Sequence, residues 1–589
     1  MRALILVLAF LAAPLMAQQA ADRLAPEGRG AGGVLVPPAL ADAARAKAEG
    51  RPVEAGRWMI AAAHPLAVEA GARVLRAGGT AADAVVAVQA VLGLVEPQSS
   101  GLGGGAFLLW HDAATGEITT LDGRETAPLS ATPRLFLDET GQPLAFFEAV
   151  VGGRSVGVPG TPALLAEVQE RWGRADWAWL FEDAIGLAET GFPVSPRLAV
   201  LVAGDAARLA RDPGTRAYFL PEGRPLQAGS VLRNPAYAET LRLFAREGPR
   251  VFYTGEIGAD IVARVRGAAG NPGLLSRTDL AIYQVRARAP LCVPYRGFEV
   301  CGMGPPSSGG VAVGQILGLL APFDLGSLGP KSAEAWRLIG DATRLAFADR
   351  GRYLADSDFV PVPVTGLLAP DYLSARSTLL RGKGALPEVA AGTPEFDHAL
   401  NWEEGQDLAQ PATSHVSIID AYGNALAMTS SIENGFGARL MVRGFLLNNQ
   451  LTDFSFASHA DGLPLANAVA PGKRPRSSMA PTILRRDGVP VLILGSPGGS
   501  RIIPYVAKTI VAMVDWGLDP QAALDLAHLV NRFGTYDLEE SASHLAPDLR
   551  ALGYEVEIRD LTSGLHVIDI GVRLRGGADP RREGLAYGE

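Results

Sequence analysis

The most constraining feature of the chain is a junction near residue 413, where a linker-like segment changes abruptly into a strand. Residues 388–412 contain six acidic residues and no Lys or Arg, which is typical of a mobile linker. The segment ends at Thr413, the first residue of the β-branched octet 413–420. After a turn, strand 425–431 is expected to run back antiparallel. We therefore predict that Ser431 lies within about one residue of Thr413 across the ladder.

A threonine at such a junction has the chemistry to cleave the bond that precedes it. Its hydroxyl would attack the carbonyl of Ala412, an ester would form, and water would release Thr413 as a new N-terminus. The free α-amine has a pKa of about 7.7–8.0, close enough to neutrality to act as the base for its own hydroxyl. Position alone does not select this hypothesis, because most threonines at linker ends only begin strands.

Two other patterns suggest different chemistry. Residues 153–157 (Gly-Arg-Ser-Val-Gly) match the serine-hydrolase elbow, but that motif requires a helix directly after the serine. Residues 158–160 (Val-Pro-Gly) intervene, so a glycine-rich connector is the better interpretation. The glycine-rich run 101–105 lacks the Gly-Lys-Ser/Thr ending of a phosphate loop. It predicts a tight turn where backbones approach closely.

The rest of the chain predicts a layered α+β architecture, because strands and helices follow each other on both sides of the linker. Helices are expected at 64–76 and at 81–95, the second capped by Thr80, and residues 160–290 are mostly helical. The other expected strands are 106–112, 117–122, 482–484 and 489–494. A glycine-rich stretch, 495–501, leads from the last of these into a further helix.

The N-terminus indicates an exported protein. Arg2 precedes the apolar run 3–15, which is too short to span a bilayer, and small residues follow. We predict a signal peptide at 1–17, with retention as an uncleaved anchor as the alternative, and a flexible leader at 18–56. The net charge of −9 and the lack of a Lys/Arg-rich block argue against a nucleic-acid partner. The mature protein is expected to lack a membrane span and to reside in the periplasm.

The two cysteines, Cys292 and Cys301, flank a predicted hairpin. A turn at Arg296-Gly297 would make them a non-hydrogen-bonded pair with Cα atoms about 4.5 Å apart. An oxidising compartment favours a disulfide over two buried thiols, although Pro294 disfavours a regular ladder. No Cys/His cluster has the spacing of metal ligands, so no metal or cofactor is predicted.

Nine segments in a fixed order give the chain a resemblance to the γ-glutamyltransferase family, from about Gly56 to the C-terminus. They are 61–67, 96–105, 122–128, 305–310, 413–415, 447–454, 473–479, 495–501 and 578–581. The resemblance implies the four-layer αββα sandwich of N-terminal nucleophile hydrolases. It also implies self-cleavage into a large chain, 57–412 with the linker at 381–412, and a small catalytic chain, 413–589, which stay together as a heterodimer.

The resemblance implies a role for each matching residue. Thr413 matches the nucleophile, and Ser431 matches the hydroxyl beside it, where the family has threonine. Gly498 and Gly499 match backbone donors for the oxyanion, each worth on the order of 10²–10³ in rate. Arg124 matches the residue that binds the substrate α-carboxylate, a task suited to a guanidinium fork.

The remaining site residues are expected around the amino-acid head of the substrate. Ser477 and Ser478 match hydroxyl partners of the carboxylate, and the α-ammonium group would be bound by Gln450, Asp453 and Glu433. Without the family match, Arg124 would be interpreted as a surface ion-pair partner of Glu125, Asp453 as a helix or turn cap, and His415 as a packed strand residue.

The sequence also departs from the family pattern. The second position of the Thr-Ser-His motif is often threonine, and Glu433 stands where asparagine is common. Only 18 residues separate Phe454 from Lys473, fewer than in members with a long lid loop, so the balance of transfer and hydrolysis stays open.

The expected activity is transfer of a γ-glutamyl group from glutathione or a related amide to water, an amino acid or a peptide. The alternative is an acylase that cleaves glutaryl or cephalosporin side chains on the same fold. A non-catalytic periplasmic binding protein is the second alternative. Oligomeric state is not indicated.

Overall fold

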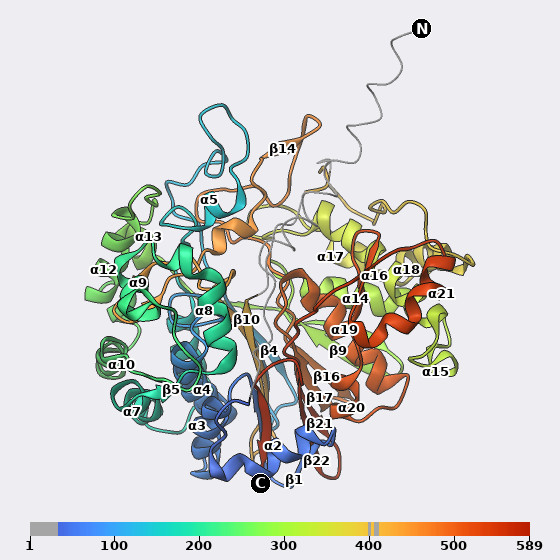
Figure 1. Cartoon of the computed structure of the whole chain (residues 1–589). Helices are drawn as coiled ribbons and strands as arrows, with labels where there is room; N and C mark the ends of the chain where they lie inside the picture. Colours follow the sequence, from blue (N-terminus) through green and yellow to red (C-terminus); the bar gives the residue numbers. More distant parts are fainter. Residues whose placement is uncertain (1–32, 399–401, 406–411) are drawn as a thin grey trace.

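Two seven-stranded sheets form the centre of the molecule in this computed structural model, which describes residues 33–398, 402–405 and 412–589 (Figure 1). In spatial order the first sheet holds β23 (Leu585–Gly588), β2 (Met59–Ala62), β10 (Thr413–Ile419), β11 (Ala425–Ser431), β3 (Gly105–His111), β4 (Ile118–Gly123) and β7 (Arg286–Arg288). The second holds β1 (Val53–Ala55), β22 (Leu574–Ala578), β21 (His566–Ile570), β17 (Val489–Gly495), β16 (Thr482–Arg486), β9 (Phe298–Gly302) and β8 (Leu291–Tyr295).

Helices cover the outer face of each sheet (Figure 1). Those on the first sheet are α3 (Pro65–Arg76), α4 (Ala81–Val95), α6 (Thr161–Trp172), α7 (Glu182–Thr190), α8 (Pro196–Leu209), α9 (Pro213–Phe219), α10 (Pro235–Glu247), α11 (Arg250–Tyr253), α12 (Glu256–Arg266) and α13 (Arg277–Ala281). Those on the second are α14 (Gly309–Leu320), α15 (Leu325–Leu328), α16 (Ala333–Tyr353), α19 (Ile502–Val514), α20 (Pro520–Asp525) and α21 (Ala546–Ala551). The layer order is αββα, as predicted.

Smaller elements surround this sandwich. They are α2 (Ala41–Ala48), α5 (Phe146–Val150), α17 (Val364–Leu367) and α18 (Pro370–Ser377), with short sheets of β5 (Phe192–Pro193) and β6 (Val231–Leu232), β12 (Met441–Val442) and β13 (Phe445–Leu446), β14 (His459–Ala460) and β15 (Leu463–Pro464), and β18 (Leu529–Asn531), β19 (Thr535–Leu538) and β20 (Glu555–Ile558).

Strand β10 shows why both faces of the first sheet are buried. Successive side chains point to opposite faces of a strand. Ile418 packs in the cluster that contains the residues of α3 and α4, whereas the next residue, Ile419, packs in the cluster shared with the second sheet. The β-branched sequence therefore supplies apolar surface to two cores at once, as expected for a strand between two layers.

The local signals in the sequence were confirmed at several places. Helix α3 begins after His64, whose ring accepts a hydrogen bond from the Leu66 amide at 3.2 Å. Thr80 and Asp83 form a reciprocal capping box at the start of α4. The expected strand pairs form as β3–β4 and β16–β17.

The predicted leader, 18–56, needs a correction in its described part. Residues 41–48 form α2, and β1 pairs with β22 at the edge of the second sheet. Lys47 donates hydrogen bonds of 2.7 Å to two carbonyl groups of the C-terminal segment, those of Arg582 and Gly584. Composition suggested flexibility, but the open edge of β22 supplies backbone partners that a composition argument does not see.

The described part of the predicted linker is held against α16. Asp341 accepts a hydrogen bond from the Leu386 amide at 3.1 Å, and Asp349 accepts one from the Gly392 amide at 2.7 Å. Trp402 is buried. The predicted signal peptide at 1–17 lies outside the described residues. Within the described part of the chain, no helix has both the length and the apolar character to cross a membrane.

The cysteine hairpin is present, with Cys292 opposite Cys301 and a disulfide between them. Arg296 and Gly297 both have positive φ, as a two-residue hairpin turn requires. Pro294 is tolerated because β8 is the edge strand of the second sheet, where one side of the backbone needs no ladder partner.

Candidate active site

Four strands of the first sheet end side by side and define the candidate site. Thr413 lies opposite Ser431, and Ser431 lies opposite Gly105 on the other side. The neighbouring residue Ala106 is opposite Gly123, the last residue of β4. The chain segments that leave this edge include residues 96–104 and 124–128, two of the motifs singled out in the sequence.

The predicted hydroxyl pair is formed. The Thr413 hydroxyl donates a hydrogen bond to Ser431 Oγ at 3.2 Å, and both side chains are buried. Ser431 Oγ in turn donates to the carbonyl oxygen of Ala412 at 2.7 Å and accepts from the Glu433 amide at 2.8 Å. One serine thus contacts both the hydroxyl and the carbonyl group of the bond that precedes Thr413.

Buried partners that the sequence analysis did not identify support this pair. Arg582 donates to the Thr413 carbonyl at 3.0 Å. Ser414 donates to Glu96 Oε2 at 3.1 Å and accepts from Ser100 Oγ at 3.1 Å. Glu96 also pairs with Arg197 at 2.8 Å. Burial raises the pKa of Glu96, and Arg197 opposes that shift. Glu96 and Ser100 lie in segment 96–105, one of the nine that carry the family resemblance, but the sequence did not predict what either residue binds.

Arg124 follows β4 and is fully buried, so the interpretation as a surface ion pair is wrong. Two backbone carbonyls fix its guanidinium group, that of Pro475 at 3.2 Å from Nε and that of Arg476 at 3.2 Å from Nη2. The same Nη2 also binds Asp453. Among the described residues, Arg124 Nη1 has no hydrogen-bond partner. A guanidinium fixed on one side with one nitrogen left over is suited to bind a carboxylate.

Glu125 is a second buried group at this position. Its Oε2 lies 3.6 Å from Arg124 Nη1, within ion-pair distance but beyond that of a hydrogen bond, and neither carboxyl oxygen has a hydrogen-bond partner among the described residues. Burial raises the pKa of Glu125 to about 8, although Arg124 opposes the shift. A Cβ atom on Gly105 would lie 2.6 Å from Glu125 Oε2, so the carboxyl group packs directly against the row of strand ends.

The residues predicted to bind an ammonium group are Glu433, two residues after the end of β11, and Gln450 and Asp453. A short 3-10 helix begins at Gln450 and ends at Asp453. Glu433 accepts a hydrogen bond from the side chain of Asn449, and Gln450 Oε1 is buried without a partner among the described residues. Asp453 is bound to Arg124, so the anionic and cationic groups expected to bind the substrate head neutralise each other here.

The two predicted serines lie on the segment that follows Arg476. The Met479 amide donates to Ser477 Oγ at 3.1 Å, and Arg350 donates to Ser478 Oγ at 2.7 Å. Arg350 also donates to Ser308 Oγ at 2.8 Å. Arg350 was not identified from the sequence, because it lies inside helix α16, far from any quoted motif.

Gly498 and Gly499 follow β17, with φ of 137° and 55°, and Gly499 opens the 3-10 turn that leads into α19. Amide groups at such a helix start point outward and favour negative charge. Strand β17 approaches β10 so closely that a Cβ atom on Gly495 would lie 2.3 Å from the ring of His415. The end of β17, three residues before Gly498, thus packs against β10, the strand that carries Thr413.

His415 is a packed residue, as interpreted from the sequence. It is fully buried, and its ring nitrogens contact Thr429 Oγ1 at 2.8 Å and Ser417 Oγ at 3.0 Å. Burial lowers the pKa of His415 well below its usual value. Both ring nitrogens are engaged by hydroxyl groups other than that of Thr413, so His415 is not placed to take a proton from Thr413.

The two rejected patterns are structural as well. Ser155 is buried and donates to the Val150 carbonyl at 2.7 Å. In the glycine run, a Cβ atom on Gly103 or Gly104 would lie about 2 Å from a backbone oxygen of the neighbouring segments. Within the described residues, no group of three His, Cys, Asp or Glu side chains is placed to hold a metal ion.

Comparison with known proteins decides the family, since the model of the gamma-glutamyltranspeptidase family matches residues 67–589. The chain belongs to this family. The chain is therefore a γ-glutamyl acyltransferase and hydrolase.

Relatives of known name fall into two groups. The glutathione hydrolase proenzyme of Bacillus subtilis (strain 168) is 36% identical over 556 residues, covering 92% of this chain and 93% of the relative. The acylase ACY 1 proenzyme of Pseudomonas sp. (strain SE83) is 37% identical over 517 residues, covering 86% of this chain and 88% of the relative.

Solved structures show the same division. Cephalosporin acylase from Bacillus halodurans has a TM-score of 0.81 and 27% identity, covering 92% of this chain and 97% of that chain. Gamma-glutamyltranspeptidase of Helicobacter pylori has a TM-score of 0.55 and 34% identity, covering 57% of this chain and 96% of that chain.

Proposed function

We propose that this enzyme is an exported glutathione hydrolase and γ-glutamyltransferase that cleaves its own chain before Thr413. The observation that carries the proposal is the Ser431 hydroxyl, which binds both Thr413 Oγ1 and the Ala412 carbonyl oxygen. Cleavage would leave a large chain that ends at Ala412 and a small chain that begins at Thr413. The apolar run 3–15 after Arg2, from which a signal peptide at 1–17 is predicted, supports export to the periplasm.

Maturation would proceed as an acyl shift. Thr413 Oγ1 attacks the Ala412 carbonyl carbon, its proton passes to the Thr413 nitrogen, and the peptide bond to that nitrogen breaks, which gives an ester and the free α-amine. Water then hydrolyses the ester, which releases Ala412 as a carboxylate and restores the Thr413 hydroxyl. Arg582 holds the Thr413 carbonyl, which keeps the residue in place while its peptide bond is exchanged.

The mature enzyme would use the same hydroxyl on its substrate. The α-amine takes the Thr413 proton while Oγ1 attacks the γ-carbonyl of the donor, and the amides of Gly498 and Gly499 stabilise the resulting oxyanion. The amine product departs with that proton. Water or an acceptor amine then attacks the γ-glutamyl ester and regenerates Thr413.

Donor binding would exchange partners within a buried ion pair. Arg124 and Asp453 are bound to each other, and an amino-acid head offers a carboxylate to the first and an ammonium to the second. The number of buried charge pairs rises from one to two, and none is left unpaired. Ser477 and Ser478 would add hydroxyl contacts to the carboxylate, and Gln450 and Glu433 would surround the ammonium.

The test compares matched γ-glutamyl and glutaryl anilides, which differ only in the α-amino group. We expect the wild type to prefer the γ-glutamyl anilide by at least about a hundredfold in kcat/KM, because a glutaryl donor leaves buried carboxylates without a counter-charge. Asp453→Asn should strongly reduce kcat/KM for the γ-glutamyl anilide, because the α-ammonium group loses its carboxylate partner. It should reduce kcat/KM for the glutaryl anilide little, because a neutral side chain at position 453 does not compete with the donor carboxylate for Arg124. Arg124→Gln should reduce both.

The acylase names among the relatives make a glutaryl or cephalosporin side chain the alternative donor. A wild-type preference for the glutaryl anilide would select this alternative. An Asp453→Asn variant that loses both activities equally would show that Asp453 does not bind the ammonium group. A wild type that is never cleaved and turns over neither anilide would favour the remaining alternative, a binding protein that does not cleave itself.

A further inference from the structure

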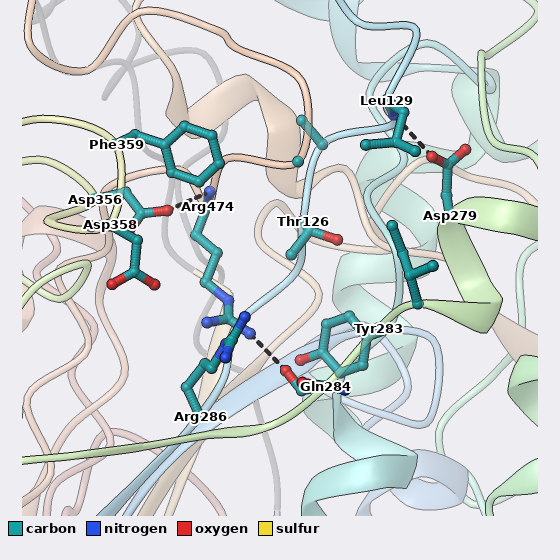
Figure 2. A pocket seen from close by; sticks show the side chains of 13 residues that line it. Thr126, Leu129, Asp279, Tyr283, Gln284, Arg286, Asp356, Asp358, Phe359 and Arg474 are labelled. Atoms are coloured by element: carbon teal, nitrogen blue, oxygen red, sulfur yellow. Dashed lines mark hydrogen bonds between the residues drawn. The ribbon is translucent and has the colours of Figure 1, made fainter.

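Figure 2 shows a surface pocket whose lining includes Thr126 and Leu129, which follow Arg124 in the chain, but not Arg124 itself. Its cavity volume is about 190 Å³, less than that of a site for a drug-sized ligand, so only a small molecule would fit. Segments 126–129, 282–286 and 356–359 form its walls together with Gly472 and Arg474. None of these residues has a role in the proposed reaction.

The acidic side chains of the pocket are already engaged. Asp279 accepts hydrogen bonds from the Leu129 amide at 2.8 Å and from Ser276, and Asp356 accepts one from the Arg474 amide at 2.8 Å. Asp358 receives two hydrogen bonds from Arg288, at 3.1 and 2.9 Å. Each of the three aspartates already accepts hydrogen bonds, so a cationic ligand would compete with an existing partner.

The two arginines of the pocket differ in a way that sets the charge of its ligand. The guanidinium of Arg474 pairs with Asp122 at 3.0 Å and donates to the Gln284 carbonyl at 2.8 Å. Arg286 lies on β7 and is exposed; the charge of Asp358 acts on it from a distance, but no residue that the structure describes forms a hydrogen bond or ion pair with its guanidinium. It is the cation of the pocket that is open to an anion.

Three large apolar side chains gather around the same pocket. Leu129 is 47% exposed, Ile282 56% and Phe359 47%, and all three line the pocket. A Cβ atom on Gly472 would contact both Leu129 and Phe359, so the absence of a side chain there keeps the space between them open. Exposed apolar groups clustered beside a cation favour a ligand with an apolar body and an anionic end.

We propose that this pocket binds a small carboxylate with an apolar or aromatic body, of the kind found at the carboxyl end of an apolar amino acid or dipeptide. The carboxylate would bind Arg286, whose planar fork suits it, and the apolar body would lie on Leu129, Ile282 and Phe359. Tyr283 of the pocket wall donates to the Arg124 carbonyl at 2.9 Å, so the ligand would sit behind the donor site and not in it.

The test is calorimetric titration of the wild-type enzyme with 3-phenylpropanoate, which has no amino group to act as an acceptor. We expect saturable binding that persists with saturating L-glutamate in the donor site. Replacing the probe by 3-phenylpropanamide, or Arg286 by Gln, should weaken binding at least tenfold. Phe359→Ala should weaken it severalfold. Arg211→Gln is the matched control, since Arg211 is also exposed and lies outside the pocket.

The readout is binding and not turnover, so its outcome is separable from that of the proposed function. No saturable binding by the wild type would overturn the proposal. Equal binding by Arg286→Gln, equal binding of the amide probe, or displacement of the probe by L-glutamate would overturn it as well.

Discussion

Glu125 and Arg124 form the part of the site whose charge is most sensitive to its surroundings. Arg124 is surrounded by carbonyl groups and carboxyl groups, whereas the Glu125 carboxyl group has no hydrogen-bond donor within the described residues. The desolvated carboxyl therefore retains its proton near neutrality, since its pKa is raised to about 8. At neutral pH the charge of Arg124 remains available to Asp453 and to a donor carboxylate.

This arrangement predicts weaker carboxylate binding in alkaline solution. As pH rises through about 8, Glu125 ionises 3.6 Å from Arg124 Nη1 and competes with the ligand carboxylate. The competitive inhibition constant of L-glutamate should rise severalfold between about pH 7 and pH 9. It should stay nearly flat in Glu125→Gln, which serves as the control. Parallel profiles for the two proteins would contradict this role for Glu125.

The same shift has a stability consequence with a definite sign. The folded pKa lies above the ordinary value of 4.5, so the folded state binds the proton more tightly than the unfolded chain. The contribution of Glu125 to the free energy of unfolding is full below about pH 4.5 and is lost as pH rises to about 8.

At the scale of elements, the strand pair β10–β11 brings Thr413 and Ser431 together, and the hairpin β8–β9 forms one edge of the second sheet. The ladder between β10 and β11 is in register from Thr413↔Ser431 to Ile419↔Ala425, so the turn at 420–424 determines which hydroxyl faces Thr413. The hairpin at the opposite sheet is closed by the Cys292–Cys301 disulfide.

The disulfide predicts a stability effect without an effect on catalysis. Replacing both Cys292 and Cys301 by serine should lower the free energy of unfolding by about 2–3 kcal/mol in the chain-entropy account, less any strain released. Activity per folded molecule should not change, because β8 is the edge strand of the second sheet. Urea unfolding and anilide turnover measure the two effects. Thiols that alkylate in the unreduced wild type would show that the bond is absent in solution.

At the scale of the whole molecule, the two future chains are interleaved. Within the first sheet, β10 and β11 of the small chain lie between β2 and β3 of the large chain, and β23 of the small chain lies on the outer side of β2. In the second sheet, β1 and β9 of the large chain border β22 and β16 of the small chain. Separation would break ladders in both sheets.

We therefore predict that the cleaved chains remain one particle until they unfold. Denaturing gels should show two bands, with Thr413 as the N-terminal residue of the smaller one, whereas native chromatography should give a single species that contains both. Thr413→Ala should stay intact and inactive but elute at the same position, which is the matched control for folding. Active wild-type enzyme that is never cleaved would contradict the mechanism.

The sequence by itself determined the local structure and the nucleophile hypothesis. The β-branched octet, the Gly-containing turn and the returning strand required only neighbouring residues, and they placed Ser431 opposite Thr413. Thr80 likewise predicted the start of α4, and the Arg296-Gly297 turn predicted the hairpin that pairs the two cysteines. The roles of Arg124 and Asp453 came from the family resemblance, because spacing along the chain does not indicate which distant residues meet.

Only the tertiary structure decided which partners the site residues have. Arg582 reaches the Thr413 carbonyl from a segment 169 positions away in the chain, and Arg350 reaches Ser478 from inside α16. Arg124 is buried and not on the surface. In the predicted leader, residues 53–55 pair with the edge of β22, and Lys47 of α2 binds carbonyl groups of the C-terminal segment. Each of these outcomes depends on strands and helices that pair across long sequence separations, where local propensity carries no information.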